Sequence, residues 1–463
     1  MCGIVGVVGR EQAATWASRG LYALQHRGHD SCGVAWLNEP ENSIEVRSGM
    51  GAVADVLPDS VTKPLPARAV IGQNLYTTFG HTHSTQPFGG RFWDKEGRRF
   101  DVALVHNGQI CGIEKLRRRY PVMYRSESDT EIIFSLLPHM PGTTLAEKVR
   151  AVLGEIEGAY SLLFLHPGGV IAARDARGFR PLTLAEDDRG GVFFASELNA
   201  FDLMNAKFTR EVAPGEMVEV SLDGSLRASR FCDPAPNLSQ CVFEHIYFAR
   251  PDNQLFGKAG YSTQRALGRQ AARELKGRVD ADIVIAVPDS ANVATLGFAD
   301  ELGLPFEIGL IRHHYAARTF ITRGQSNREE AVRLKFNVIK DVVKGRRVIL
   351  GDDSLVRATT SRIVISMLRQ GGAREVRLVL FSPPITHPCH YGINMASPDE
   401  LVASRYQSDT AVIARQIGAD SVHYLSLPGL REVMGADAKN YCYACMTGSY
   451  PVTPDHHAES CSS

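Results

Sequence analysis

The feature that most limits the possible folds is a change of pattern near Pro234-Ala-Pro236. Beyond this point, apolar segments of strand length alternate with segments of helical spacing. Strands are expected at 283–287, 347–350 and 376–380, and helices at 294–302 and 360–371. This βαβ alternation predicts a mainly parallel sheet covered by helices. The second half of the chain is therefore expected to be an α/β domain.

The first half, up to about Arg230, is rich in short β-branched and aromatic segments bounded by glycine or aspartate. Strands are expected at 3–9, 102–106, 161–165, 169–174 and 191–195. Helical spacing occurs at 15–25, 129–137 and 144–157. This mixture predicts sheets covered by helices, an α+β arrangement.

Length and composition agree with a two-domain protein. The chain has 463 residues, too many for a single hydrophobic core. We expect domains at 1–235 and 236–453 and a polar tail at 454–463. The 51 basic and 51 acidic residues cancel, so no nucleic-acid partner is expected. The apolar runs are of strand length and no secretory signal is evident, so we expect no membrane segment and a cytoplasmic location.

The second residue is a cysteine, which has a specific chemical use if Met1 is removed. An α-amine titrates near ~8, so it can act as general base for the thiol of the same residue. Nine cysteines without the spacing of a small disulfide scaffold also favour reduced thiols with catalytic or metal-binding roles. The alternative is that a cysteine at position 2 is an accident of the start site.

Four segments in order support the catalytic interpretation: Met1-Cys-Gly-Ile-Val-Gly6, Leu24-Gln-His-Arg-Gly28 with Asp30-Ser31, His106-Asn-Gly108 and Ser128-Asp-Thr-Glu131. Together they resemble the class II glutamine amidotransferase domain, an N-terminal nucleophile sandwich. The resemblance implies that Cys2 attacks the side-chain amide of glutamine. It further implies that Asn107 and the Gly108 N–H hold the oxyanion, and that Asp129 binds the α-ammonium group.

The chain departs from this family at His81-Thr-His-Ser-Thr85, where an arginine usually pairs with the glutamine carboxylate. Histidine cannot reproduce the planar fork of a guanidinium. Losing such a pair could weaken glutamine binding by ~1.5–3 kcal/mol. His83, Arg27 or Arg91 are the candidates to replace it.

In the second half, the segment from Val348 to Thr360 is an apolar strand that ends in two acids and a hydroxyl-rich turn. It resembles the phosphoribosyl-diphosphate motif of type I phosphoribosyltransferases. The resemblance implies that Asp352 and Asp353 hold the ribose hydroxyls or Mg²⁺. The 5′-phosphate would lie at the helix N-terminus, among Ser354, Arg357, Thr359 and Thr360. The alternative is an acidic turn that caps a helix.

Two neighbouring segments resemble the amidophosphoribosyltransferases. The Asp289-Ser290 loop would face the diphosphate, with Ser290 as a Mg²⁺ contact, and the 315–321 loop would close over the substrate and form an ammonia channel. Arg318, Arg328 and Lys335 would neutralise the diphosphate, although a solvated basic face is the alternative. Ala358 and Ala317 stand where the family usually has glycine, and a methyl group there can block a positive φ or crowd a phosphate oxygen.

Cys442-Tyr-Ala-Cys445 is a C-x-x-C pair, and Cys241 and Cys389 stand in contexts that resemble the iron–sulfur branch of the same family. The resemblance implies one 4Fe–4S cluster held by these four cysteines, with structural zinc as the alternative. The remaining cysteines are then spare thiols, namely Cys32, Cys111, Cys232 and Cys461.

The implied reaction combines glutamine, phosphoribosyl diphosphate and water to give 5-phosphoribosylamine, glutamate and diphosphate, the first step of purine synthesis. The family resemblance also implies a homodimer or homotetramer and purine nucleotide effectors. Two alternatives remain open. One is a diverged enzyme that places another nitrogen source or nucleophile on phosphoribosyl diphosphate, and the other is a non-catalytic regulator that binds it. Glucosamine or asparagine synthesis is less favoured, because neither requires the acid pair.

Overall fold

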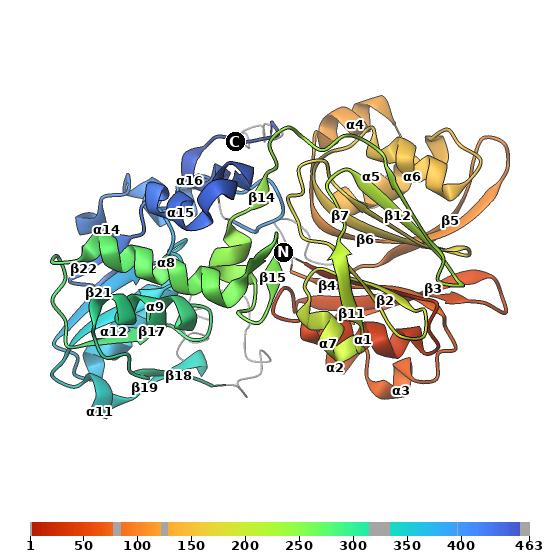
Figure 1. Cartoon of the computed structure of the whole chain (residues 1–463). Helices are drawn as coiled ribbons and strands as arrows, with labels where there is room; N and C mark the ends of the chain where they lie inside the picture. The colour runs from red at the N-terminus through yellow and green to blue at the C-terminus, as the bar shows by residue number, and fades with distance from the viewer. Residues whose placement is uncertain (1, 77–84, 122–127, 314–333, 396, 454–463) are drawn as a thin grey trace, which may run out of the picture. The chain divides into compact units, whose positions relative to one another are not determined.

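The computed structural model describes residues 2–76, 85–121, 128–313, 334–395 and 397–453, and its chain divides into two compact units (Figure 1). The first unit comprises Met1–Cys241, Cys389–Asn394 and Tyr450–Ser463, and the second comprises Val242–Pro388 and Met395–Ser449. The first unit thus includes two short segments from the far end of the sequence.

The first unit contains two antiparallel sheets. The seven-stranded sheet has the order β11 (Lys207–Glu211), β9 (Thr183–Glu186), β10 (Val192–Ala195), β1 (Gly3–Val8), β4 (Ala69–Leu75), β2 (Ser31–Asn38) and β3 (Ser43–Met50). The six-stranded sheet has the order β13 (Leu226–Arg230), β12 (Glu216–Ser221), β8 (Gly169–Arg174), β7 (Glu157–His166), β6 (Arg99–Cys111) and β5 (Phe88–Trp93).

Alternation along the strands builds three apolar layers. In β1, Ile4 and Val8 join a cluster with Val105 and Leu163 of the other sheet, which fills the space between the sheets. Val5 and Val7 point the other way. A side-chain period of two places neighbouring residues on opposite faces, so an apolar strand buried on both faces suits the centre of a sandwich.

Helices cover the outer face of each sheet (Figure 1). Over the seven-stranded sheet lie α1 (Ala13–Ala23), α2 (Val53–Val56), α3 (Asp59–Thr62) and α7 (Asn199–Met204). Over the six-stranded sheet lie α4 (Ile113–Arg119), α5 (Asp129–Leu136) and α6 (Leu145–Leu153). The first unit is therefore the α+β sandwich that the sequence predicts.

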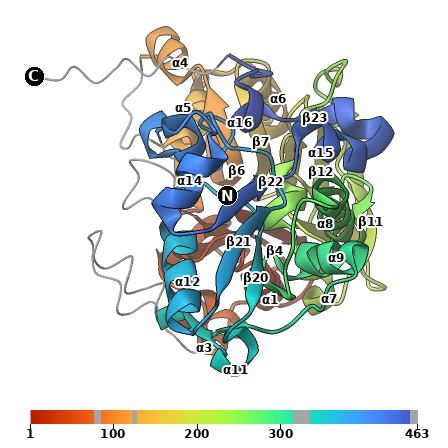
Figure 2. The same cartoon turned by 90° about the vertical axis from the view of Figure 1, so that its left-hand side faces the viewer.

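The second unit is built on a four-stranded parallel sheet of order β17 (Ile283–Ala286), β20 (Arg347–Asp352), β21 (Glu375–Leu380) and β22 (Ser421–Tyr424). Helices α8 (Gly260–Leu275) and α9 (Asn292–Leu302) lie on one side of it, and α12 (Thr359–Gln370) and α14 (Thr410–Ile417) on the other (Figure 2). The predicted α/β domain with a parallel sheet is confirmed.

Shorter elements complete the second unit. They are β15 (Gln254–Leu255), β16 (Lys258–Ala259), the antiparallel pair β18 (Leu310–Arg312) and β19 (Phe336–Val338), α11 (Lys340–Val343), α13 (Val402–Arg405), α15 (Leu427–Met434) and α16 (Ala444–Thr447).

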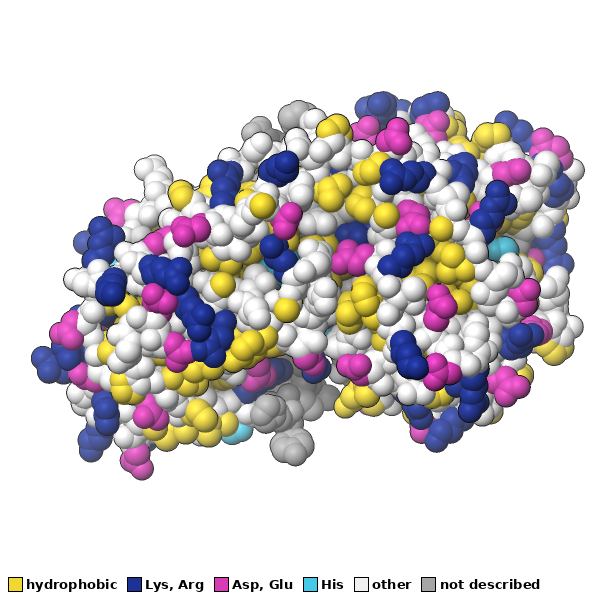
Figure 3. Space-filling model, viewed as in Figure 1, with side chains coloured by type: hydrophobic (Ala, Val, Ile, Leu, Met, Phe, Trp, Pro, Cys, Tyr) yellow, Lys and Arg dark blue, Asp and Glu magenta, His cyan; other side chains and the backbone are white. Residues whose placement is uncertain are grey.

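The surface carries both signs of charge. On the face that Figure 3 shows, Lys and Arg side chains are interspersed with Asp and Glu side chains, in keeping with the equal numbers of each in the sequence. Within the described ranges, none of the helices has the length and apolar character needed to cross a membrane.

Candidate functional site

Cys2 lies directly before the central strand β1 and is 8% exposed. Its backbone N lies 3.4 Å from Oδ1 of Asn107, which belongs to β6 of the other sheet. The two sheets of the sandwich therefore bring the predicted nucleophile and the predicted oxyanion residue together, although they are far apart in the sequence.

Asn107 and Gly108 have the properties that an oxyanion site requires. Asn107 is fully buried, and its Nδ2 has no hydrogen-bond partner among the described residues. A buried donor without a partner is costly unless a ligand or transition state uses it. Gly108 has φ 151°, and a Cβ at this position would lie 1.9 Å from the carbonyl oxygen of Ala159. Only glycine fits this position without displacing the backbone.

Asp129 is the first residue of α5 and contacts the same end of β6. Its Oδ2 accepts the Ile110 N–H at 3.0 Å and lies 3.5 Å from Nδ1 of His106, and its Oδ1 accepts the Thr130 N–H at 2.8 Å. The side chain is 19% exposed. Asp129 thus contacts the stretch of β6 that contains Asn107 and Gly108, and part of its carboxylate is accessible, as binding of an ammonium group requires.

Arg27 is fully buried beside the nucleophile. Its Nε donates to the Cys2 carbonyl oxygen at 3.0 Å, and its Nη1 forms an ion pair with Glu197. Oε1 of Glu197 also lies 3.0 Å from Nε2 of His26. Burial alone would raise the pKa of Glu197, but His26 and Arg27 outweigh it and lower the pKa to about 2. This ion pair holds Arg27 against the Cys2 backbone.

The partner of the glutamine carboxylate is not identified by the described residues. Arg91 in β5 is 41% exposed, and its Nε donates to Oδ1 of Asp101 at 2.8 Å. His83 lies outside the described residues. The assignments of Arg27, Arg91 or His83 to glutamine binding therefore stay predictions.

Sequence reasoning missed Glu197 and His26 as members of this site. A signal was present for Glu197, because the pair Ser196-Glu197 directly follows a buried strand that was predicted at 191–195. An acid at the end of a buried strand is rarely accidental, since burying a carboxylate without a partner is costly.

The acid pair lies at the carboxyl end of β20, the edge of a parallel sheet where ligands bind. Asp352 and Asp353 are both buried. Burial raises the pKa of both carboxyls, and the neighbouring Asp353 raises that of Asp352 further. Oδ2 of Asp353 accepts a hydrogen bond from Ser290 Oγ at 2.6 Å, and Oδ1 accepts one from Ser354 Oγ at 2.7 Å. Three predicted residues are thus hydrogen-bonded together.

Among the other predicted phosphoribosyl residues, Lys335 acts on this pair through its charge, and Asp289 and Arg357 form ion pairs elsewhere. The positive charge of Lys335 lowers the pKa of both acids, opposing the effect of burial. Asp289 accepts a hydrogen bond from Arg312 at 2.6 Å, and Arg357 pairs with Glu400 at 2.8 Å.

The turn before α12, the predicted phosphate-binding turn, contains a residue with a positive φ. Thr359 and Thr360 are the first residues of α12, and Ala358 before them has φ 60° and ψ 0°. The alanine therefore adopts the left-handed conformation for which glycine is usual, instead of blocking it. Ala317, Arg318 and Arg328 lie outside the described residues.

The four cysteines of the predicted cluster lie in different surroundings. The Cys241 N–H donates to the Phe179 carbonyl at 3.2 Å, and Cys389 Sγ accepts the Tyr391 N–H at 3.4 Å. In the second unit, Cys442 belongs to β23 (Tyr441–Cys442) and Cys445 to α16. Among the described residues, no group of three or more His, Cys, Asp or Glu side chains is arranged to hold a metal ion.

Of the thiols predicted as spare, burial raises the pKa of Cys32 to about 12 and also raises that of Cys232. Such thiols are poor nucleophiles at neutral pH. Cys111 lies with its Sγ 3.8 Å from the His390 carbonyl oxygen, and Cys461 is outside the described residues.

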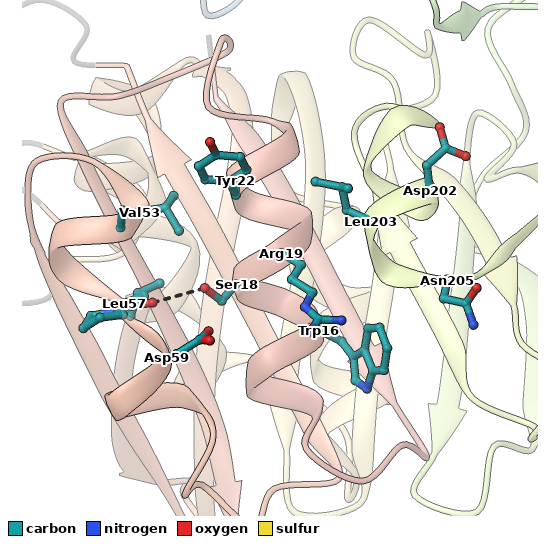
Figure 4. Close-up of a pocket in the computed structure, with 12 residues that line it drawn as sticks. Trp16, Ser18, Arg19, Tyr22, Val53, Leu57, Asp59, Asp202, Leu203 and Asn205 are labelled. Atoms are coloured by element: carbon teal, nitrogen blue, oxygen red, sulfur yellow. Dashed lines mark hydrogen bonds between the residues drawn. The ribbon is translucent and has the colours of Figure 1, made fainter. Parts of the chain in front are cut away.

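A surface hollow of about 770 Å³ lies elsewhere on the first unit, between α1, α7 and the α2–α3 segment (Figure 4). Trp16 and Arg19 of α1, Leu57 and Leu203 line it. It contains none of the predicted catalytic or binding residues.

Comparison with known proteins supports both halves of this arrangement. A glutamine amidotransferase domain family matches residues 78–203. The amidophosphoribosyltransferase of Archaeoglobus fulgidus is 39% identical over 98% of this chain and 98% of its own length. Amidophosphoribosyltransferase 2 of Arabidopsis thaliana, a chloroplastic protein, is 38% identical over 98% of this chain and 80% of its own.

A solved structure has the same fold. It is that of the Bacillus subtilis glutamine phosphoribosylpyrophosphate amidotransferase in complex with ADP and GMP, with a TM-score of 0.88 and 35% identity over 98% of each chain. Since the relatives and the solved structure cover nearly the whole chain, the protein belongs to the amidophosphoribosyltransferase family.

Proposed function

We propose that this chain transfers the amide nitrogen of glutamine to C1 of phosphoribosyl diphosphate. The products are 5-phosphoribosylamine, glutamate and diphosphate, as in the first step of purine synthesis. The observation that carries the proposal is the pairing of Cys2 with a buried Asn107 whose Nδ2 is without a partner among the described residues, in a chain that also has the Asp352–Asp353 pair.

In the glutaminase half, the Cys2 thiol attacks the side-chain carbonyl carbon while the α-amine of the same residue takes its proton. Asn107 Nδ2 and the Gly108 N–H would donate hydrogen bonds to the oxygen on which the negative charge develops. The proton then passes to the leaving ammonia, and water hydrolyses the thioester to glutamate. Arg27 holds the Cys2 carbonyl and so fixes the direction of the thiol.

In the phosphoribosyl half, ammonia attacks C1 of the ribose as the bond to diphosphate breaks, and the ammonium formed gives up one proton. Asp352 and Asp353 would hold the ribose hydroxyls, and the Ser354–Thr360 turn the 5′-phosphate. Lys335, whose charge is felt by both acids, would neutralise the departing diphosphate.

Magnesium fits the acid pair. Two buried carboxylates and the Ser290 hydroxyl form a set of hard oxygen donors, which Mg²⁺ prefers. Their raised pKa values reflect burial that a bound cation would compensate. When bound, Mg²⁺ would supply positive charge next to the diphosphate.

A 4Fe–4S cluster remains the proposed second cofactor, with Cys241, Cys389, Cys442 and Cys445 as its ligands. The donor chemistry fits, because such clusters are held by four thiolates. Tyr391 supplies an N–H to Cys389 Sγ, the type of hydrogen bond that stabilises a thiolate ligand. The backbone N–H groups of Thr386 and His387 both donate to the Cys445 carbonyl at 3.0 Å, which fixes the chain two residues before Cys389.

Regulation is proposed from a solved relative, assembly from the family resemblance and location from the chemistry of the thiols. The Bacillus subtilis structure contains ADP and GMP, so purine nucleotides are the proposed effectors here. A homodimer or homotetramer is the proposed assembly. A cytoplasmic location is proposed because reduced thiols suit the chemistry of Cys2 and of the cluster.

A second candidate function is a diverged enzyme that uses another nitrogen donor. It is favoured because the segment 81–85 lacks the arginine that is usual in the family. The two arginines that could replace it, Arg27 and Arg91, both form ion pairs with carboxylates of this chain. Such an enzyme would consume phosphoribosyl diphosphate with ammonium but not with glutamine.

The test compares the two nitrogen donors. With wild-type protein, we expect diphosphate release with glutamine and with ammonium. Cys2→Ala should reduce the glutamine-dependent rate by at least about 10³-fold and leave the ammonium-dependent rate intact. Cys232→Ala is the matched control and should retain both rates. Glutamine turnover by Cys2→Ala would overturn the proposal, and binding of phosphoribosyl diphosphate without turnover would indicate a regulator.

A further inference from the structure

The segment Cys389–Asn394 belongs to the first unit, although it follows β21 of the second unit in the sequence. Arg180, which is fully buried, donates from Nε to the Tyr391 carbonyl at 2.9 Å, and its Nη2 donates to the same oxygen. The Tyr391 ring packs on Phe179 with ring centroids 4.4 Å apart. A charged side chain is buried here to hold one carbonyl, so the segment is firmly fixed.

The next residue of the segment lies against the predicted oxyanion site. A Cβ on Gly392 would lie 2.8 Å from both the carbonyl carbon and the carbonyl oxygen of Gly108, and 3.0 Å from its Cα. Gly392 also has φ 97°, in the region that favours glycine. On its other side, Gly108 is confined by Ala159 of β7. The Gly108 backbone is thus held between a strand of the sheet and Gly392.

We propose that Gly392 is a positioning residue for the oxyanion site. By lying in backbone contact with Gly108, it keeps the Gly108 N–H directed at the oxygen of the scissile amide. This inference rests on the proposed function, because it assigns Gly392 to the glutaminase step. It adds a residue from the far end of the sequence to a site otherwise built from the first half.

The expected kinetic effect follows from the timing of the interaction. The oxyanion exists only in the transition state, so a shift of Gly108 should lower kcat for glutamine and leave KM nearly unchanged. Removal of one oxyanion donor typically costs about 10²–10³ in kcat. Gly392→Ala displaces a donor without deleting it, so we expect a fall of about tenfold to a hundredfold.

The experiment measures glutamine hydrolysis, ammonium-dependent synthesis and the alkylation rate of Cys2 by iodoacetamide, followed on the N-terminal peptide by mass spectrometry. For Gly392→Ala, glutamine kcat should fall, while the other two rates stay within about twofold of wild type, because neither needs the oxyanion site. Gly418→Ala is the control. Its φ is also positive, at 77°, but the nearest atom to its Cβ is 4.0 Å away, so it should retain all three rates.

A second variant protects the test against misfolding. Tyr391→Phe keeps the ring packing and removes the hydroxyl, which donates to the Val452 carbonyl at 2.6 Å and accepts the Val452 N–H at 3.0 Å. This loosens the segment without a clash, and glutamine kcat should fall about two- to fivefold. If kcat is unchanged in every variant that folds, the inference is overturned. If wild-type protein does not hydrolyse glutamine, the proposed function itself is wrong. The two results can therefore be told apart by the rate of the wild-type protein.

Discussion

Ala358 occupies a backbone conformation that its side chain disfavours. Its φ of 60° and ψ of 0° lie in the left-handed region, directly before α12. Because glycine reaches this region without a steric penalty, Ala358→Gly should raise the free energy of unfolding by about 1 kcal/mol. Chemical denaturation measures this. Ala411→Gly, at an exposed position in α14, is the control and should lower it by about 0.5–1 kcal/mol. Loss of stability in Ala358→Gly would contradict the assigned strain.

Glu197 is the buried counter-ion of Arg27 and His26, and its pKa is about 2. A carboxyl whose pKa is lower in the folded state stabilises the fold above the unfolded value near ~4.5, and this stabilisation is lost as the pH falls toward ~2. The shift corresponds to about 3 kcal/mol. We therefore expect Glu197→Gln to be much less stable than wild type at pH 7, with a smaller difference at pH 3.

Urea unfolding at the two pH values checks this prediction. Glu186→Gln is the control, because Glu186 is exposed at the end of β9 and should change stability by less than about 0.5 kcal/mol. An equal loss of stability at both pH values would show that the charge of Glu197 is not the cause.

At this scale, the sequence offers candidates for the residues that carry chemistry, but few for the residues that support them. Cys2, Asn107, Gly108 and Asp129 could be proposed because their types and order resemble a known site. Gly392 could not, since its role comes from a close backbone approach between distant segments. Glu197 was recognisable only as an acid that needs a partner.

Helices α8 and α9 cross at two glycines. A Cβ on Gly268 would lie 1.7 Å from the Ala294 carbonyl oxygen, and one on Gly297 would lie 2.3 Å from the Arg265 carbonyl oxygen. Gly268→Ala must push the helices apart, so we expect a loss of about 1–3 kcal/mol or more in unfolding free energy. Thermal or urea unfolding followed by circular dichroism measures it.

Gly303→Ala separates the effect of packing from that of backbone conformation. Gly303 ends α9 with φ 70° and has open space around its Cβ position, so its substitution should cost only about 1 kcal/mol. If Gly268→Ala lowered the unfolding free energy no more than Gly303→Ala does, the close approach of α8 and α9 at Gly268 would not contribute measurably to stability.

The helices and strands that could be predicted were those with a buried apolar face. Both β17 and β20 are almost entirely buried, and the sequence places strands at both positions. By contrast, β3 is only partly buried and β13 is largely exposed, both contain many polar residues, and the sequence predicts no strand at either position. They are strands because they pair with β2 and β12. Such pairing is a tertiary effect that cannot be predicted from the local amino-acid composition.

On the scale of the whole molecule, the change of pattern near 235 lies close to where the first continuous stretch of unit one ends, at Cys241. The return of Cys389–Asn394 and of Tyr450 to that unit could not be predicted. Such short segments contain no apolar period of their own, so only their contacts decide where they belong.

The proposed cluster gives a whole-molecule prediction. Protein purified without oxygen should contain four irons and four sulfides per chain and show the visible absorbance of an iron–sulfur cluster. Cys445→Ser should lose both and unfold at a lower temperature, because metal-ligand bonds stabilise the folded state. Cys232→Ser is the control and should keep the cluster. If the protein instead contained zinc and showed no visible absorbance, the four cysteines would form a structural zinc site and the cluster proposal would be wrong.

The position of β1 has a consequence for synthesis on the ribosome. This strand precedes both of its neighbours in the chain, and the later one, β10, ends at Ala195. At ~5–20 residues per second, translation from β1 to that point takes roughly 10–40 s. Until then the earliest strand of the sheet has an unfilled edge, so it depends on a delayed partner and is open to mispairing. Removal of Met1, which the proposed chemistry needs, has this same interval in which to occur before Cys2 is enclosed.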